Sequence, residues 1–128
     1  MKIEDIKFKA KRLDNGEWVY GSLIRSTAGV KERAYIVDNF SSMSDYSVVG
    51  IDPSTVCQFT GLKDCEGNEI WEGDIVEREI YDLYKGFTKV KAVVKYMDGE
   101  FVAITGGVPY SLYFKYIKVV GNKFDKKE

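Results

Sequence analysis

Two strong β-hairpin signals constrain the fold of this chain, one near each end of the sequence. Apolar residues and lysines alternate over residues 6–11, ahead of a turn that contains Asn15-Gly16. Asp98-Gly99 joins two further strand-like segments, 88–96 and 100–105. Asn-Gly and Asp-Gly supply the positive φ values that tight hairpin turns require. The sequence therefore predicts an antiparallel, all-β fold.

The composition agrees with strands and excludes several kinds of chemistry. Aromatic residues make up 14% of the 128 residues, which favours strands over helices. No histidine is present, so histidine-based catalytic triads and zinc sites are excluded. A net charge of −1 differs from the strongly basic balance of a dedicated nucleic-acid binder. The two cysteines, Cys57 and Cys65, have neither zinc nor redox spacing.

The order of the expected elements predicts how the chain is divided. Residues 57–122 are expected to form an SH3-like barrel, with one helical turn at most within residues 106–115. Residues 1–56 form an added N-terminal β-hairpin subdomain in this prediction, and residues 123–128 form a charged tail. No signal peptide or membrane span is recognisable, so we expect a cytoplasmic protein with no membrane contact.

The segment 58–76, QFTGLKDCEGNEIWEGDIV, is rich in both carboxylates and glycines. It fails as an EF-hand loop, because counting from Asp64 puts Glu69 where glycine is needed and Ile75 where the last ligand is needed. Turn chemistry explains more of its residues. We therefore expect a structural turn motif made of Gly61, Asp64, Gly67, Trp71, Glu72, Gly73 and Asp74.

This segment resembles the signature of the YopX family, small proteins of phages and prophages. The matching positions are Gln58, Phe59, Thr60, Gly61, Leu62, Asp64, Gly67, Ile70, Trp71, Glu72, Gly73, Asp74 and Ile75. Residues 6–21 and 117–125 resemble the family's opening hairpin and closing element, although Lys123 stands where an apolar residue is usual. The resemblance implies an all-β fold with an SH3-like barrel and oligomeric assembly through the N-terminal part. It carries over no catalytic residue.

Two surfaces are candidates for binding. Lys7, Lys9 and Lys11 share one face of a strand, beside Trp18 and Tyr20 on the next strand. This face could contact phosphates and stack bases, but a solvated strand face explains the same lysines. The second surface is aromatic and could form a peptide groove, close the mouth of the barrel or form a subunit interface. Its residues are Tyr81, Tyr84, Phe87 and Tyr96.

We expect a non-enzymatic phage or prophage accessory protein that acts by protein–protein association. The expected partners are further copies of the chain and an unidentified phage or host protein, and no cofactor or metal is expected. A nucleic-acid-binding small barrel is the alternative. A carboxylate-based metal enzyme would require Asp64, Glu69, Glu72 and Asp74 to converge in space.

Overall fold

The computed structural model describes residues 2–26, 33–38, 47–112 and 116–125. Within these residues the chain contains strands and two single-turn 3₁₀ segments, η1 (Ile3–Asp5) and η2 (Pro53–Thr55), and no α-helix. The all-β prediction is confirmed. These described residues contain no helix with the length and apolar character needed to cross a membrane. The chain forms two compact units, Met1–Phe59 and Thr60–Glu128.

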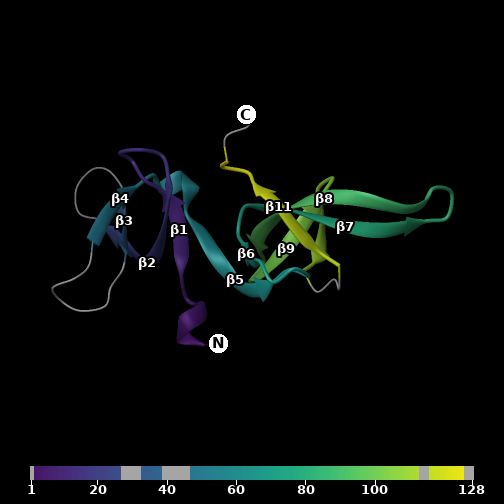
Figure 1. Cartoon of the computed structure of the whole chain (residues 1–128), viewed down its shortest axis with the longest axis horizontal. Helices are drawn as coiled ribbons and strands as arrows, with labels where there is room; N and C mark the ends of the chain where they lie inside the picture. The colour runs from purple at the N-terminus through teal and green to yellow at the C-terminus, as the bar shows by residue number, and fades with distance from the viewer. Residues whose placement is uncertain (1, 27–32, 39–46, 113–115, 126–128) are drawn as a thin grey trace. The chain divides into compact units, whose positions relative to one another are not determined.

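The first unit is an antiparallel sheet that begins with the predicted hairpin. Its strands are β1 (Phe8–Lys11), β2 (Trp18–Ser26), β3 (Arg33–Asp38) and β4 (Ser47–Ile51), joined by the start of β5 (Cys57–Lys63). They lie in the order β4-β3-β2-β1-β5 (Figure 1). Gly16 has a φ of +72° in the β1–β2 turn, so the first hairpin is confirmed.

Gly21 lies where β2 changes from one pairing partner to another. Residues up to Gly21 pair with β1, and residues from Ser22 onward pair with β3. The φ of Gly21 is +156°, and a Cβ atom there would overlap the carbonyl oxygen of Val37. Glycine is therefore required where β2 changes partner.

The core of the first unit lies between the two halves of this bent sheet. Its buried members are Ala10, Val19, Ala34, Ile36, Val49 and Ile51. The end of β4 returns to the end of β1, where the N–H of Leu13 donates to the carbonyl of Gly50 at 3.1 Å. These contacts bend the sheet around its core, which buries apolar side chains from all four strands.

The second unit contains a five-stranded antiparallel sheet and a short additional strand. The sheet contains β7 (Asp74–Asp82), β8 (Gly86–Met97), β9 (Glu100–Thr105), β10 (Val108–Ser111) and β11 (Lys118–Asn122), in the order β10-β9-β8-β7-β11. The end of β5 is bonded to β6 (Glu69–Trp71). Asp98 and Gly99 have φ values of +52° and +86°, so the second predicted hairpin is confirmed.

Residues 108–111, within the segment expected to contain one helical turn at most, form the strand β10. Gly106 and Gly107 have φ values of +58° and +78°, and they make the tight turn that folds β10 back onto β9. Two adjacent glycines with positive φ favour a hairpin over a helix. Residues 113–115 lie outside the described part of the chain.

The described residues form no closed barrel. The SH3-like barrel expected for residues 57–122, and the hairpin subdomain expected to be added to it, are therefore not confirmed. The buried core of the second unit comes mainly from β6 to β9 and the segment that precedes β11. Its members are Ile70, Val76, Ala92, Val94, Ala103, Leu112 and Ile117.

Candidate functional site

The acidic segment is organised around turns, with Asp64 at its centre. One carboxylate oxygen of Asp64 accepts from the backbone N–H groups of Glu66 and Asn68, at 2.9 and 2.8 Å. The other oxygen accepts from the N–H of Val119 at 2.9 Å. Burial alone would raise the pKa of Asp64, but these donors outweigh it and the pKa lies below its ordinary value. Asp64 therefore ties its own turn to β11.

Asp74 has a similar position at the start of β7. Its two carboxylate oxygens accept from the N–H of Trp71 at 2.8 Å and from the side-chain amide of Asn122 at 2.9 Å. Between Trp71 and Asp74 lie Glu72, which is half-buried, and Gly73, which has a φ of +86°. The N–H of Gly73 donates to Val94 at 2.8 Å, which joins this turn to β8.

The glycines of the segment have the backbone conformation that turns need. Gly61 and Gly67 have φ values of +84° and +85°, in the left-handed region that glycine adopts without strain. Among the described residues, no group of three or more acidic or cysteine side chains is placed to hold a metal ion. The carboxylates of Asp64 and Asp74 bind backbone and amide donors of the protein itself.

The predicted lysine face is a packed layer of ammonium groups and aromatic rings. The Nζ atoms of Lys9 and Lys11 lie 4.5 and 4.4 Å from the centre of the Trp18 ring. Lys9 also lies 5.9 Å from the centre of the Tyr20 ring, and Lys9 is only 7% exposed. The prediction of a solvated strand face is therefore wrong for Lys9, because neighbouring rings cover it.

Lys7 makes the same kind of contact with β5, the neighbour of β1 on the edge opposite β2. Its Nζ atom lies 4.7 Å from the centre of the Phe59 ring, and Phe59 is buried. The structure thus brings the five predicted residues to one face, where rings and lysines contact each other. A ring that is already covered by an ammonium group of its own chain offers less surface on which a base could stack.

The second predicted surface lies at the end of the long β7–β8 hairpin. Figure 1 shows this hairpin, in green, extending beyond the other strands of its sheet. Tyr81 pairs with Phe87 across the hairpin, and their ring centres are 5.2 Å apart. The apolar side chains at this end are strongly exposed: Tyr81 64%, Leu83 86%, Tyr84 97% and Phe87 76%.

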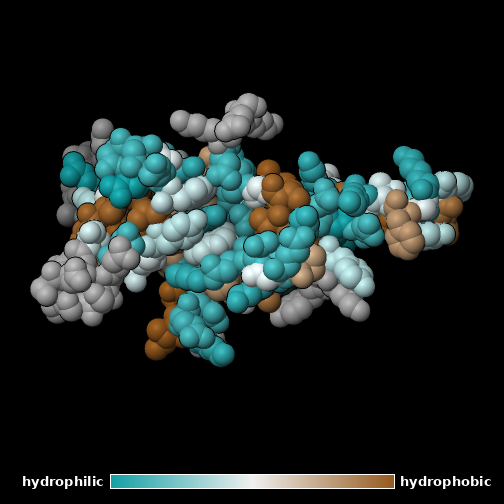
Figure 2. All heavy atoms as spheres, in the orientation of Figure 1, coloured by the Kyte–Doolittle hydropathy of each residue, from teal (hydrophilic) through white to brown (hydrophobic). Residues whose placement is uncertain are grey.

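The hairpin tip, defined as residues 81–87, is therefore an apolar surface in solvent. Figure 2 shows hydrophobic residues, in brown and tan, at the far end of the hairpin. Tyr96 lies elsewhere, near the β8–β9 turn, and packs edge-to-face on Phe101 at 5.2 Å. The four predicted aromatics thus do not form one groove. Asp82 caps the tip by accepting from the N–H of Tyr84 at 2.7 Å.

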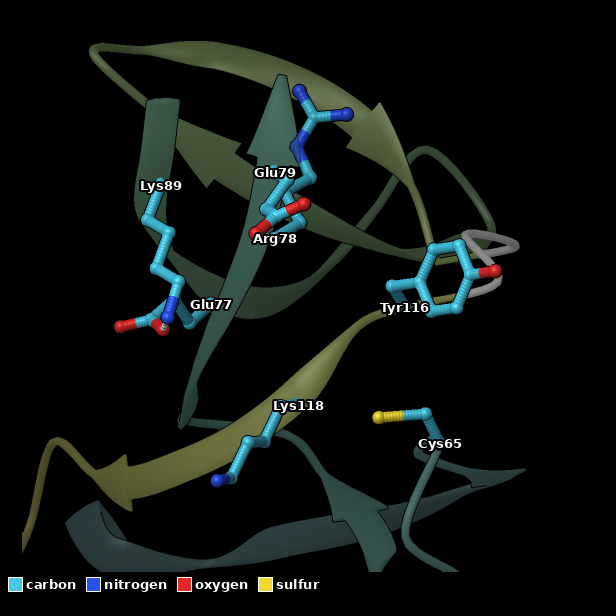
Figure 3. Close-up of a pocket in the computed structure, with 7 residues that line it drawn as sticks. All are labelled: Cys65, Glu77, Arg78, Glu79, Lys89, Tyr116 and Lys118. Carbon is cyan, nitrogen blue, oxygen red and sulfur yellow. Dashed lines mark ion pairs between the residues drawn. The ribbon is translucent and has the colours of Figure 1, made fainter. Parts of the chain in front are cut away.

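A pocket of about 190 Å³ lies beside the base of the hairpin (Figure 3). Its lining residues are Cys65, Glu77, Arg78, Glu79, Lys89, Tyr116 and Lys118. Lys89 pairs with Glu77 at 3.7 Å, and Lys118 pairs with Glu66 at 3.2 Å. The hydrogen bond that Lys118 donates to the carboxylate of Glu66 raises the pKa of Lys118. We call this the β7 pocket.

Sequence reasoning missed the β7 pocket and Leu83. The pocket joins β7 to residues that are distant in the sequence, such as Cys65 and Tyr116, and no local pattern connects them. Figure 3 shows the guanidinium of Arg78 pointing away from Cys65 and Lys118. That guanidinium lies over the Tyr110 ring, 4.0 Å from its centre. A signal for Leu83 was present, since an apolar residue in the polar turn Asp82–Lys85 is unusual.

The fold and these surfaces define a small all-β protein whose clearest feature is an exposed apolar hairpin tip. A profile of the YopX protein family matches residues 7–128. The chain belongs to this family. A search of curated proteins gave no match.

Proposed function

We propose that the chain is a non-enzymatic accessory protein of a phage or prophage, and that it works by association with further copies of itself. The observation that carries this proposal is the hairpin tip. Leu83 and Tyr84 are 86% and 97% exposed at the end of a regular hairpin. Soluble proteins seldom keep clustered large apolar side chains in solvent unless these side chains contact a partner.

The position of the tip supports the proposal. A two-stranded hairpin is only marginally stable by itself, because few of its side chains are covered. Beyond the pair Glu77↔Lys91, the β7–β8 hairpin continues through five further residue pairs to Asp82↔Gly86. A second protein surface would cover this part of the hairpin and offset the cost of exposing it.

The family membership supports the phage context, and a cytoplasmic location with a further phage or host partner belongs to the same proposal. We also propose an opened SH3-like barrel for the second unit, with the first unit as the added subdomain. The strand order β11-β7-β8-β9-β10, in which the last strand lies beside the first, supports this relation.

A nucleic-acid-binding role is the second candidate. It is favoured by the single face that Lys7, Lys9 and Lys11 share with Trp18 and Tyr20. The burial of Lys9 and the coverage of Trp18 argue against it, because both would have to rearrange before they could contact phosphates or bases. The net charge of −1 also gives little attraction for a polyanion.

The test is the mass of the full chain in solution as a function of its concentration, measured by sedimentation velocity. A mass that rises above that of a single chain supports self-association. A single-chain mass at every concentration up to the millimolar range would refute it. Fluorescence anisotropy with labelled single-stranded DNA, duplex DNA and RNA at low salt tests the alternative, which requires salt-sensitive binding.

A further inference from the structure

The outer edge of β7 changes character along the strand. β11 pairs with β7 from Asp74 to Glu77, where Lys118 is the last partner. Among the described residues, β7 has only β8 as its neighbour from Glu79 to Asp82. A strand edge without a neighbour exposes backbone N–H and C=O groups that can pair with another strand.

The β7 pocket lies where this open edge begins. Glu77 and Glu79 line it on β7, and Tyr116 and Lys118 line it at the start of β11 (Figure 3). A strand that continued the line of β11 along Glu79–Asp82 would therefore begin beside this pocket. The hairpin tip begins at Tyr81, at the other end of the same edge.

One chain thus carries an edge, a pocket at the start of the edge and an apolar tip at its end. These are the parts of a self-complementary contact. In a two-fold arrangement each surface patch meets the same patch of the other copy, so the tip of one copy can reach the pocket of the other.

We propose that two copies pair through the outer edges of β7, about a two-fold axis at Ile80, and that the tip of each copy enters the β7 pocket of the other. This inference rests on the self-association proposed above and specifies its geometry. Antiparallel pairing about Ile80 places Glu79 opposite Tyr81 and Arg78 opposite Asp82 of the second copy. In this register Leu83 of the second copy would lie opposite Glu77. β11 already occupies the edge of β7 at Glu77, so Leu83 lies beyond the paired residues.

Charge favours a second copy as the occupant. The tip carries one carboxylate, Asp82, and one ammonium group, Lys85. The pocket carries both signs, with Lys89 and Lys118 beside Glu77 and Glu79. A tip with one charge of each sign suits a pocket that carries both signs, whereas a strongly acidic or strongly basic partner would meet repulsion from one of the two sets.

Disulfide trapping tests this geometry. Ile80→Cys, in a Cys65→Ser background, places a thiol on the proposed two-fold axis, where directly opposite Cα atoms lie within disulfide range. Thr88→Cys is the matched control, because Thr88 pairs with Ile80 across the hairpin. In the proposed dimer the two Thr88 positions are separated by three strand spacings of about 4.8 Å, too far to bridge.

We expect mild oxidation to convert Ile80→Cys to a covalent dimer at least about tenfold faster than Thr88→Cys, given this difference in reach. Equal rates, or a faster Thr88→Cys reaction, would overturn the proposal, the latter in favour of pairing through β8. Circular dichroism confirms that both variants fold. If Ile80→Cys fails to fold, a mixture of the Glu79→Cys and Tyr81→Cys variants tests the same register, because these two positions lie opposite each other. The absence of a mixed disulfide dimer overturns the proposal.

The outcome is distinguishable from failure of the proposed function. A chain that self-associates in sedimentation but shows no preference for Ile80→Cys keeps the proposed function and loses this geometry. A chain that stays monomeric at every concentration loses both.

Discussion

The carboxylate of Asp64 accepts a hydrogen bond from the backbone N–H of Val119, which lies 55 residues later in the sequence. This contact connects the turn after β5 to the last strand of the second unit. The same carboxylate also binds the N–H groups of Glu66 and Asn68. One ionised side chain therefore stabilises both a local turn and a distant strand.

Replacement of Asp64 by alanine should destabilise the protein strongly. It removes the acceptor of three backbone N–H groups and of the Asn68 side-chain amide. Leaving these donors without an acceptor costs about 2–4 kcal/mol of unfolding free energy. Urea denaturation at neutral pH measures this cost. Asp98→Asn is the control, since asparagine suits the positive φ of Asp98, and it should change the stability by less than about 0.5 kcal/mol.

The stability should also fall at acidic pH because of Asp64. Its pKa in the folded protein lies below the ordinary value of 3.8. The ionised group therefore stabilises the fold above that ordinary value, and this stabilisation is lost as the pH falls through the folded pKa. Asp64→Asn should flatten the dependence of the unfolding free energy on pH below about 4. An unchanged slope in this variant would contradict the role assigned to Asp64.

Gly21→Ala should destabilise the first unit more than an ordinary turn substitution does. A Cβ atom at Gly21 would overlap the carbonyl oxygen of Val37, so β2 and β3 would have to separate locally. We expect a loss of about 2–4 kcal/mol in urea denaturation, which is typical of a severe backbone clash. Gly16→Ala is the matched control, because Gly16 has a positive φ but no atom within 4 Å of the added Cβ. It should cost only about 1 kcal/mol, and equal losses would refute the steric argument.

Features set by local chemistry could be predicted from the sequence. Asn15-Gly16 and Asp98-Gly99 identified their hairpins because the φ values of the turn residues depend on little else. The same logic led to the turn reading of Asp64. The β9–β10 hairpin was not predicted, although the two adjacent glycines Gly106-Gly107 with positive φ values form its turn.

Features set by distant pairing could not be predicted. The burial of Lys9 depends on Trp18 and Tyr20 lying across the strand pair, and alternation alone suggested solvent on that face. The open edge of β7 depends on where β11 ends its pairing, at Glu77. The β7 pocket follows from that end point, so neither could be recognised before the register was known.

Lys11→Ala should cost a modest amount of stability and leave nucleic-acid binding unchanged. The ammonium group of Lys11 lies 4.4 Å from the centre of the Trp18 ring, and such contacts contribute about 0.5–1 kcal/mol. Lys63→Ala removes an exposed lysine and should change the unfolding free energy by less than about 0.5 kcal/mol. A loss of affinity for labelled single-stranded DNA in Lys11→Ala, but not in Lys63→Ala, would favour the nucleic-acid alternative.

Leu83→Ser should weaken self-association without weakening the fold. Leu83 is 86% exposed at the hairpin tip, so its replacement leaves the core of the second unit intact. In the proposed dimer the same side chain is buried in the β7 pocket of the second copy, and its loss there costs about 1.5–3 kcal/mol. The dissociation constant should therefore rise about 10- to 100-fold. Leu13→Ser is the matched control, because Leu13 is also well exposed, at 70%, but lies in the β1–β2 turn of the first unit.

Sedimentation equilibrium measures both dissociation constants, and thermal melting shows whether either variant has lost stability. A larger effect from Leu13→Ser than from Leu83→Ser would place the association surface on the first unit and remove the hairpin tip from it.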